Sequence, residues 1–104
     1  MENNKDKLLY FVLICSPKLK GKFHALLQDN GARSINTISA RGSAPKSVIL
    51  EAFGMGATDK KYILSTLLPY DVAINLINIL YNEYDFNKPN SGIAFTIPVE
   101  GLLF

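Results

Sequence analysis

LLYFVLIC, from Leu8 to Cys15, is a continuous apolar run near the start of this 104-residue chain. Its short length and its aromatic and β-branched content favour a buried strand over a helix. A strand that is covered by helices on one face only normally alternates apolar and polar side chains. This run does not alternate, so we expect both faces of the strand to be dry, and the fold must supply a cover for each.

A helix is predicted directly after this strand. Ser16 is expected to be its N-cap and Pro17 its first helical residue. Asn30-Gly31 ends the helix, as a left-handed cap does. One apolar stripe runs along the helix, formed by Leu19, Phe23, Leu26 and Leu27.

The rest of the chain predicts two strands, a second helix and a last strand. Residues Ala32–Ala40 alternate as a strand with one polar-leaning face, and Lys61–Leu68 is a stronger strand that Pro69 ends. GIAFTIP, residues 92–98, is the last strand. The helix that precedes it is apolar on more than one side, with Ile74 and Ile79 lying off its main stripe. That stripe consists of Val72, Ala73, Leu76, Ile77, Leu80 and Tyr84.

The predicted order of elements is β-α-β-β-α-β, which is the ferredoxin-like split βαβ arrangement. The sequence thus predicts an α+β sandwich, with one face of a four-stranded antiparallel sheet covered by two helices. The first and third strands should occupy the middle of the sheet, because they carry the most continuous apolar runs. We expect residues 1–104 to form a single domain.

The second face of the sheet has no predicted element left to cover it, so another copy of the chain is the natural cover. We therefore expect a homo-oligomer with its sheets facing inward. The stretch after the last strand is also apolar, with Leu102, Leu103 and Phe104 following Glu100. These three residues are expected at a subunit contact; packing on their own subunit is the alternative.

A long connection, Arg41–Lys60, joins the second and third predicted strands. It is too long for a hairpin turn, and long loops in compact domains are often functional. Exposed apolar side chains on such a loop are costly unless they bind something. We predict a partner-docking role for this connection, with simple self-packing as the alternative. The candidate docking residues are Val48, Leu50, Phe53 and Met55.

Composition argues against several classes of function. A net charge of +2 is too small to indicate nucleic-acid binding. One cysteine, Cys15, precludes an intrachain disulfide, and one histidine, His24, gives neither a metal site nor a catalytic pair. We expect neither catalytic nor metal-ligating residues, and so not an enzyme. The start of the chain lacks the apolar segment of a signal peptide, which predicts a cytoplasmic protein.

The last strand carries a more specific pattern. Gly92, Phe95 and Pro98-Val99-Glu100 form G-x-x-F-x-x-P-V-E. With the order of elements over residues 7–100, this stretch resembles the PII signal-transduction proteins, the nitrogen-regulatory family. The resemblance implies a compact homotrimer and identifies residues 41–60 with the family's T-loop, which docks into partner proteins such as transporters and enzymes. It also implies that adenine nucleotides bind in clefts between subunits.

The chain departs from the family in its phosphate-binding turn. The family's T-G-x-x-G-x-G-K is replaced by YDFNKPNSGI, in which Ile93 stands in the place of the lysine. No arginine follows Arg41, and the tyrosine that some members carry in the T-loop is missing. Lys88 is a candidate replacement for the missing cation. The candidate ligand residues are Arg41, Gly42, Lys46, Lys88, Asn90, Ser91 and Gly92.

These features together predict a PII-like regulatory protein. It would sense a small molecule, an adenine nucleotide or another anion, in clefts between subunits and report it to a protein partner through the long loop. The alternative is an oligomeric protein-interaction module that needs no ligand.

Overall fold

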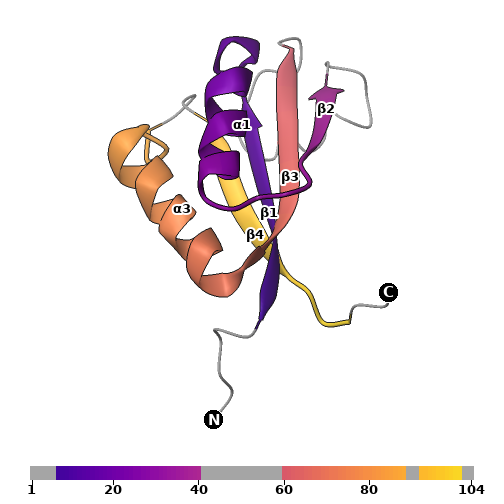
Figure 1. Ribbon diagram of the computed structural model, residues 1–104. Coiled ribbons are helices and arrows are strands. Elements are labelled where there is room, and N and C mark those ends of the chain that lie inside the picture. Colours follow the sequence, from indigo (N-terminus) through magenta and orange to yellow (C-terminus); the bar gives the residue numbers. More distant parts are fainter. Residues whose placement is uncertain (1–6, 41–59, 89–91, 102–104) are drawn as a thin grey trace.

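The computed structural model describes residues 7–40, 60–88 and 92–101 (Figure 1). Two α-helices, a short 3-10 helix and four strands follow one another in the predicted order. They are β1 (Leu8–Cys15), η2 (Pro17–Leu19), α1 (Lys20–Asp29), β2 (Asn36–Ala40), β3 (Lys61–Pro69), α3 (Tyr70–Glu83) and β4 (Ile93–Pro98).

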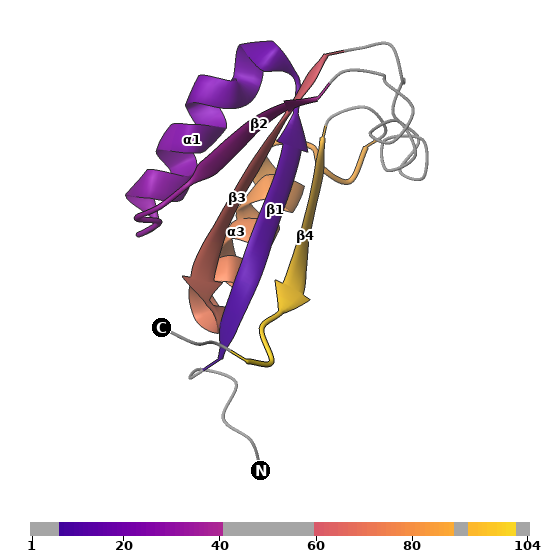
Figure 2. The same cartoon turned by 90° about the vertical axis from the view of Figure 1, so that its right-hand side faces the viewer.

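The four strands form one antiparallel sheet in the order β2-β3-β1-β4. This order confirms the ferredoxin-like α+β fold and places the first and third strands in the middle. Figure 2 shows that no helix of the described chain lies over the second face of the sheet. β1 pairs with β3 over its whole length, from Leu8–Pro69 to Cys15–Tyr62.

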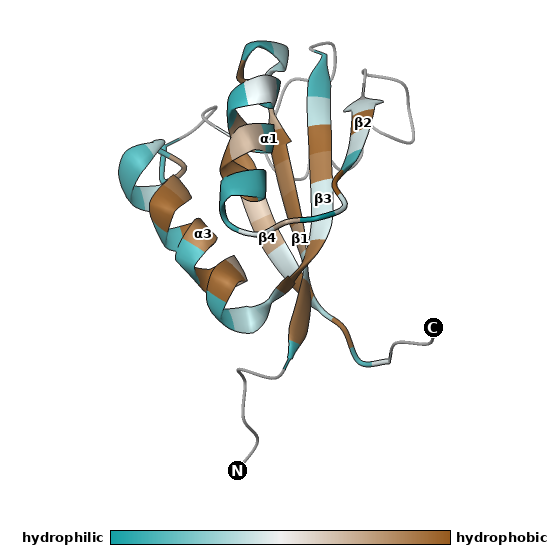
Figure 3. Ribbon diagram, viewed as in Figure 1, coloured by the Kyte–Doolittle hydropathy of each residue, from teal (hydrophilic) through white to brown (hydrophobic). Residues whose placement is uncertain are grey.

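Alternate residues of β1 serve two different surfaces. Leu9, Phe11, Leu13 and Cys15 point into the core between the sheet and the helices. The helices complete this core with buried apolar residues, namely Phe23, Leu27, Ala73, Leu76 and Leu80. Figure 3 shows the apolar colour running along nearly all of β1, as expected of a strand with two dry faces.

The face of the sheet turned away from the helices is called here the open face. Val12 and Ile14 of β1 are buried on it, and Ile14 packs against partly buried Ile63, Ile93 and Phe95. Toward its edges and lower end the open face exposes large apolar side chains: Ile38 at 52%, Leu67 at 43% and Ile97 at 47%. The second face of the sheet is thus apolar, as the sequence predicts, with its centre buried and part of its edges exposed in the described chain.

Ser16 is at the N-cap and Pro17 is at the first position of the 3-10 helix, as predicted, but the expected capping hydrogen bond is missing. The Ser16 side chain makes no capping hydrogen bond, and its buried Oγ has no hydrogen-bond partner among the described residues. The chain enters α1 through the 3-10 turn, in which the Leu19 N–H donates to the Ser16 carbonyl at 3.0 Å. That N–H is the donor that an N-cap hydroxyl would have satisfied, so the backbone replaces the side chain in this role.

The predicted left-handed end of α1 is confirmed. Gly31 has φ +98°, and its N–H donates to the Gln28 carbonyl at 3.0 Å. The Ala32 N–H reaches back to the Leu27 carbonyl at 3.0 Å. These two hydrogen bonds are those of a Schellman motif, in which glycine is the favoured residue because it adopts positive φ without strain.

The second strand is shorter than predicted. β2 begins at Asn36, not at Ala32, and its pairing with β3 begins at Asn36–Ser65. The Ser34 carbonyl accepts a hydrogen bond from the Thr66 hydroxyl at 2.7 Å. The Thr66 side chain thus holds the chain before Asn36 beside β3, in place of the backbone pairing that a longer strand would make. No helix of the described residues is long and apolar enough to cross a bilayer.

Candidate functional site

The described residues that flank the two segments expected to bind ligand lie at one end of the sheet. Ala40 pairs with Lys61, so the long connection leaves and re-enters the sheet at neighbouring positions. Ile93 pairs with Ile14, which places the start of β4 at the same end. β2 and β4 are, however, the opposite edges of a four-stranded sheet, about 14 Å apart at the usual strand spacing. The described residues next to the two predicted segments, Ala40 and Ile93, are therefore on opposite edges of one subunit.

The turn after α3 has a fixed backbone. The N–H groups of Tyr84 and Phe86 both donate to the Leu80 carbonyl, at 3.2 and 3.1 Å. Asp85 adopts φ +60°, and its carbonyl accepts from the Lys88 N–H at 2.9 Å. The Lys88 ammonium lies 3.6 Å from the Asp85 carboxylate, and both side chains are exposed. The Lys88 ammonium is therefore exposed at the surface. An anion that binds it has to displace its ion pair with the Asp85 carboxylate.

Gly92 lies against the aromatic ring of Phe86. A Cβ atom at this position would lie 2.5 Å from Cζ of Phe86, and the backbone φ is +150°. The Phe86 ring packs edge-to-face on Phe23, with centroids 5.5 Å apart. Beside it is a cavity of about 240 Å³ that lies between α3 and β4. Its lining residues are Ile77, Leu80, Tyr81, Phe86, Gly92, Ile93 and Ala94.

Of the predicted ligand residues, the structure describes Lys88, which contacts Asp85, and Gly92, which contacts Phe86. The other predicted residues lie outside the described part of the chain: Arg41, Gly42, Lys46, Asn90 and Ser91 among the ligand candidates, and Val48, Leu50, Phe53 and Met55 among the docking candidates. Their roles stay predictions.

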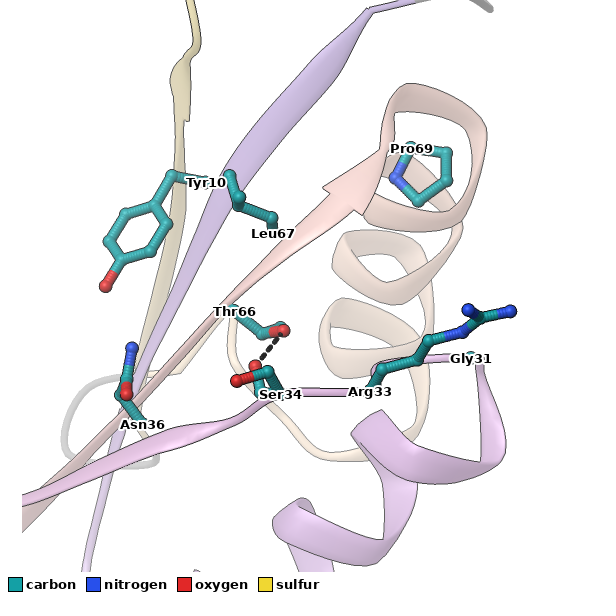
Figure 4. Close-up of a pocket in the computed structure, with 8 residues that line it drawn as sticks. All are labelled: Tyr10, Gly31, Arg33, Ser34, Asn36, Thr66, Leu67 and Pro69. Carbon is teal, nitrogen blue, oxygen red and sulfur yellow. Dashed lines mark hydrogen bonds between the residues drawn. The ribbon is translucent and has the colours of Figure 1, made fainter. Parts of the chain in front are cut away.

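A second and larger cavity, of about 550 Å³, lies on the β2–β3 side of the molecule (Figure 4). It opens where β2 stops pairing and β3 continues alone toward Pro69. Figure 4 shows the Tyr10 and Asn36 side chains on one side of it and the Arg33 guanidinium on the other. The lining residues are Tyr10, Gly31, Arg33, Ser34, Asn36, Thr66, Leu67 and Pro69.

The chemistry of this cavity combines an apolar wall with hydrogen-bonding groups and one cation. The Tyr10 hydroxyl donates to Ser65 Oγ at 2.6 Å, which fixes the ring of Tyr10 on the open face. Arg33 and Asn36 are exposed, and none of the described lining residues is acidic. Guanidinium and amide groups beside apolar surface suit a small, partly apolar molecule that carries negative charge.

The sequence analysis missed this cavity. Its one available signal was the pair Ser65-Thr66, which places two buried polar residues in the middle of an otherwise apolar central strand. Buried polar groups are almost always hydrogen-bonded, and here Thr66 bonds the loop that carries Arg33. The pair indicated a special contact, but the sequence did not show with which segment.

The end of the sheet from which the long connection departs is basic. The ammonium groups of Lys20 and Lys60 lie 4.7 and 5.1 Å from the centre of the Tyr62 ring. Lys61 is next to Lys60 and pairs with Ala40. These cations would attract an anion toward the base of residues 41–59.

Cys15 faces the core at the same end. Its side chain is fully buried, as predicted from the sequence. Burial raises the pKa of the Cys15 thiol to about 11, against an opposing effect of the Lys61 ammonium. The thiol is therefore neutral and unreactive at physiological pH.

Comparison of the sequence with protein-family models and with curated proteins gives no match. Solved structures of PII-like signalling proteins nevertheless share the fold. One, from Thermus thermophilus, has 17% identity and a TM-score of 0.65 over 89% of this chain and 86% of its own. CPII from Thiomonas intermedia, bound to ADP, AMP and acetate, has 15% identity and a TM-score of 0.66 over 91% and 90%.

A second structure of CPII, described as a nitrogen regulatory PII-like protein and bound to ADP, AMP and bicarbonate, has 19% identity and a TM-score of 0.59 over 89% and 94%. The chain thus has the fold of the PII-like proteins over nearly its whole length. At this level of identity the likeness establishes the fold alone.

Proposed function

We propose that this PII-like chain is a signalling protein that binds a small anionic molecule, with an adenine nucleotide as the first candidate. The observation that carries the proposal is the cavity of about 550 Å³ that Arg33 and Asn36 line. The fold adds support, because CPII, with the same fold, has been solved with ADP and AMP bound. The ligand state is passed to a protein partner through the loop 41–60, as the sequence analysis expects.

The binding cleft is composite. Arg33 and Asn36 lie toward the β2 edge of the sheet, and Lys88 and Gly92 lie near the β4 edge. Head-to-tail contacts in a ring of copies bring one edge of each subunit against the other edge of the next. Arg33 and Asn36 lie toward the Pro69 end of the strands and Gly92 lies toward the Cys15 end, so the two halves form one cleft only in a ring whose neighbouring subunits are also offset along the strands.

A ring of this kind also covers the open face. Exposed Ile38, Leu67 and Ile97 then turn inward, and their burial contributes about 25 cal/mol for each Å² of apolar surface removed from water. A trimer is the assembly that the sequence resemblance favours. It leaves the basic ends with Lys20 and Lys60 free for a docking partner.

Calorimetric titration of the purified oligomer with ATP, ADP and AMP, and with inorganic phosphate as the simplest anion, tests the binding. We expect micromolar affinity for at least one nucleotide. Arg33→Ala and Lys88→Ala should each weaken it about tenfold or more, since a charge-assisted hydrogen bond contributes roughly 1.5–3 kcal/mol. Absence of binding by every nucleotide would contradict the sensor and favour the ligand-independent interaction module.

Mixed oligomers test the composite cleft. When Arg33→Ala and Lys88→Ala subunits are unfolded together and reassembled, intact clefts form wherever two unmodified halves meet, which random mixing gives in about one quarter of positions. The matched control mixes Arg33→Ala with Asn36→Ala, which disable the same half and cannot restore each other. Equal results in the two mixtures would show that each cleft belongs to one subunit.

A further inference from the structure

Five lysines gather at the end of the molecule from which the long connection departs, and they are called here the lysine cluster. Lys18 lies in η2, Lys20 and Lys22 lie in the first turn of α1, and Lys60 and Lys61 lie at the start of β3. All five keep solvent-exposed surface. No carboxylate of the described residues lies within ion-pair distance of any of them. The cluster is thus an uncompensated positive surface without a defined partner.

Two ammonium groups of the cluster share one aromatic ring. Nζ of Lys20 lies 4.7 Å from the centre of the Tyr62 ring, and Nζ of Lys60 lies 5.1 Å from it. The two positive charges are therefore within about 10 Å of each other, a distance over which physiological salt screens them only in part. The ring attracts each ammonium group, but the two groups repel each other. A carboxylate between them removes this repulsion, so the geometry suits an anionic group.

The start of α1 adds to the positive potential. The N-terminus of a helix carries partial positive charge, which acidic residues in the first turn normally offset. The first turns of η2 and α1 contain no acidic residue, and Lys18, Lys20 and Lys22 lie there instead. Cations at this position lower the stability of a helix. Their placement is therefore explained by the binding of an anion and not by folding.

The lysine cluster is too wide for one small anion. Lys20 reaches Tyr62 of β3, whereas Nζ of Lys22 lies 4.9 Å from the ring centre of Tyr84, at the end of α3. Two positions along a helix differ by about 200°, so these lysines reach opposite sides of α1, which is about 10–12 Å wide with its side chains. Figure 1 shows β3 and α3 on the two sides of α1. Three extended residues span roughly 10 Å, so an acidic segment can contact both sides at once, whereas a phosphate ion contacts one.

The surroundings of the cluster favour a protein segment over a membrane or a nucleic acid. The large apolar side chains that the described chain exposes lie on the open face and on α3, so none lies among the lysines to enter a bilayer. The whole chain has a net charge of +2, which is small for a nucleic-acid-binding protein. Leu102, Leu103 and Phe104 lie outside the described residues, and their expected place at a subunit contact stays a prediction.

We propose that the lysine cluster docks an extended acidic segment of a protein partner, whose carboxylates lie on both sides of the start of α1. The Tyr62 ring positions Lys20 and Lys60 for one of these carboxylates. The docking depends only on the charges and spacing of the cluster. That this partner is the one to which the loop 41–60 reports rests on the proposed function.

A rhodamine-labelled, capped peptide of about ten glutamate residues, long enough to cross the start of α1, tests the docking by fluorescence anisotropy. Lys20→Gln and Lys22→Gln should each weaken its binding about twofold to fivefold. The control is Lys7→Gln, which removes the same charge beside the opposite end of β1. Equal losses from Lys7→Gln and from the cluster variants would show that net charge alone attracts the peptide, and would overturn the docking.

A variant that keeps every charge tests the role of the ring. Tyr62→Leu retains an apolar side chain against the core but removes the ring that holds Lys20 and Lys60. We expect it to weaken peptide binding about twofold to fivefold. Tyr81→Leu, at an exposed tyrosine of α3, is the matched control and should bind as the wild type does. Wild-type affinity in the Tyr62→Leu protein would overturn the positioning of the lysines by the ring.

Competitors separate a protein segment from other anions. Free glutamate and inorganic phosphate should not displace the peptide even at concentrations on the order of a hundred times its dissociation constant, because each makes only one of the contacts. Displacement by phosphate near the peptide's own concentration would assign the cluster to a small anion. Tighter binding to vesicles of phosphatidylcholine and phosphatidylserine, lost in Lys20→Gln, would assign it to a membrane. Either result overturns the proposed segment.

The peptide titration and the nucleotide titration fail separately. Peptide binding that depends on the cluster, without binding of any nucleotide, would refute the sensor and leave the docking in place. Nucleotide binding without peptide binding would overturn the docking and leave the sensor in place.

Discussion

Gly92 is constrained both by its own backbone and by its neighbour. Its φ of +150° is a conformation that side-chain-bearing residues rarely adopt, and the Phe86 ring occupies the space that a Cβ atom needs. The Phe86 ring is itself held by an edge-to-face contact with Phe23. The glycine that the sequence pattern singled out as a ligand residue therefore has a structural role as well.

Gly92→Ala should lower the free energy of unfolding by about 1–3 kcal/mol, because it adds both backbone strain and a steric clash. Denaturant unfolding measures this change. The matched control is Gly21→Ala, at an exposed position of α1 with open space around it, which should raise stability by about 0.5–1 kcal/mol. Wild-type stability in the Gly92→Ala protein would contradict the packing described here.

Cys15 links stability to pH. Its thiol has an ordinary pKa of 9.0, and burial in the folded protein raises the pKa to about 11. Between these two values the unfolded chain ionises while the folded chain stays neutral. Ionisation thus stabilises the unfolded state in that range, and this stabilisation is absent below pH 9.

We expect the Cys15 contribution to lower the free energy of unfolding by about 2 kcal/mol between pH 9 and pH 11. Lysines and tyrosines also titrate in this range, so the measurement is the difference between the wild-type and Cys15→Ala curves of unfolding free energy against pH. The two curves should converge as pH rises. Parallel curves would show that the Cys15 pKa is not raised by folding.

At the scale of elements, a side-chain hydrogen bond helps to determine where β2 begins. Thr66 of β3 is buried and donates to the carbonyl of Ser34, which precedes β2. This bond holds the loop that carries Arg33 beside the end of β3. The large cavity exists because the two strands diverge at this point, as Figure 4 shows.

Thr66→Val keeps the shape of the side chain and removes this hydrogen bond. It should lower the free energy of unfolding by about 1 kcal/mol, and it should increase amide exchange in residues 33–36. Thr37→Val, at an exposed position of β2, is the control and should change stability by less than about 0.5 kcal/mol. Unchanged exchange in the Thr66→Val protein would show that the loop is held by other contacts.

For the whole molecule, the open face is the surface that most needs a cover. Its centre is buried within one subunit, but Ile38, Leu67 and Ile97 expose large apolar side chains. A monomer with such a face would be prone to associate. The proposed inward-facing ring covers these side chains.

Ile97→Lys should raise the dissociation constant of the oligomer about tenfold or more, because it places a charge in an apolar contact. Sedimentation velocity over a range of concentrations measures this shift. Ala25→Lys, on an exposed position of α1, is the control that should leave the assembly unchanged. A wild-type protein that sediments as a monomer at all concentrations would refute the ring.

The sequence by itself determined the order of the elements and the layout of the sheet. Apolar runs and their periods depend on local residues, so β1 and β3 were predicted close to their observed bounds, and the apolar stripe of α3 was predicted with them. The non-alternating β1 also predicted the open face, because the need for two dry faces follows from side-chain pattern alone. Gly31 ended α1 as expected, since positive φ is a local property of the backbone.

Only the tertiary structure decided the start of β2, the uncapped Ser16 hydroxyl and the large cavity. Each depends on which of several available acceptors a polar group is hydrogen-bonded to in the folded chain. The Thr66 hydroxyl donates to the carbonyl of Ser34, which lies 32 residues earlier in the sequence. The Leu19 N–H donates to the Ser16 carbonyl rather than to the Ser16 hydroxyl. The cavity forms where paired strands separate. Such choices depend on distances between elements, which are fixed only when the chain packs.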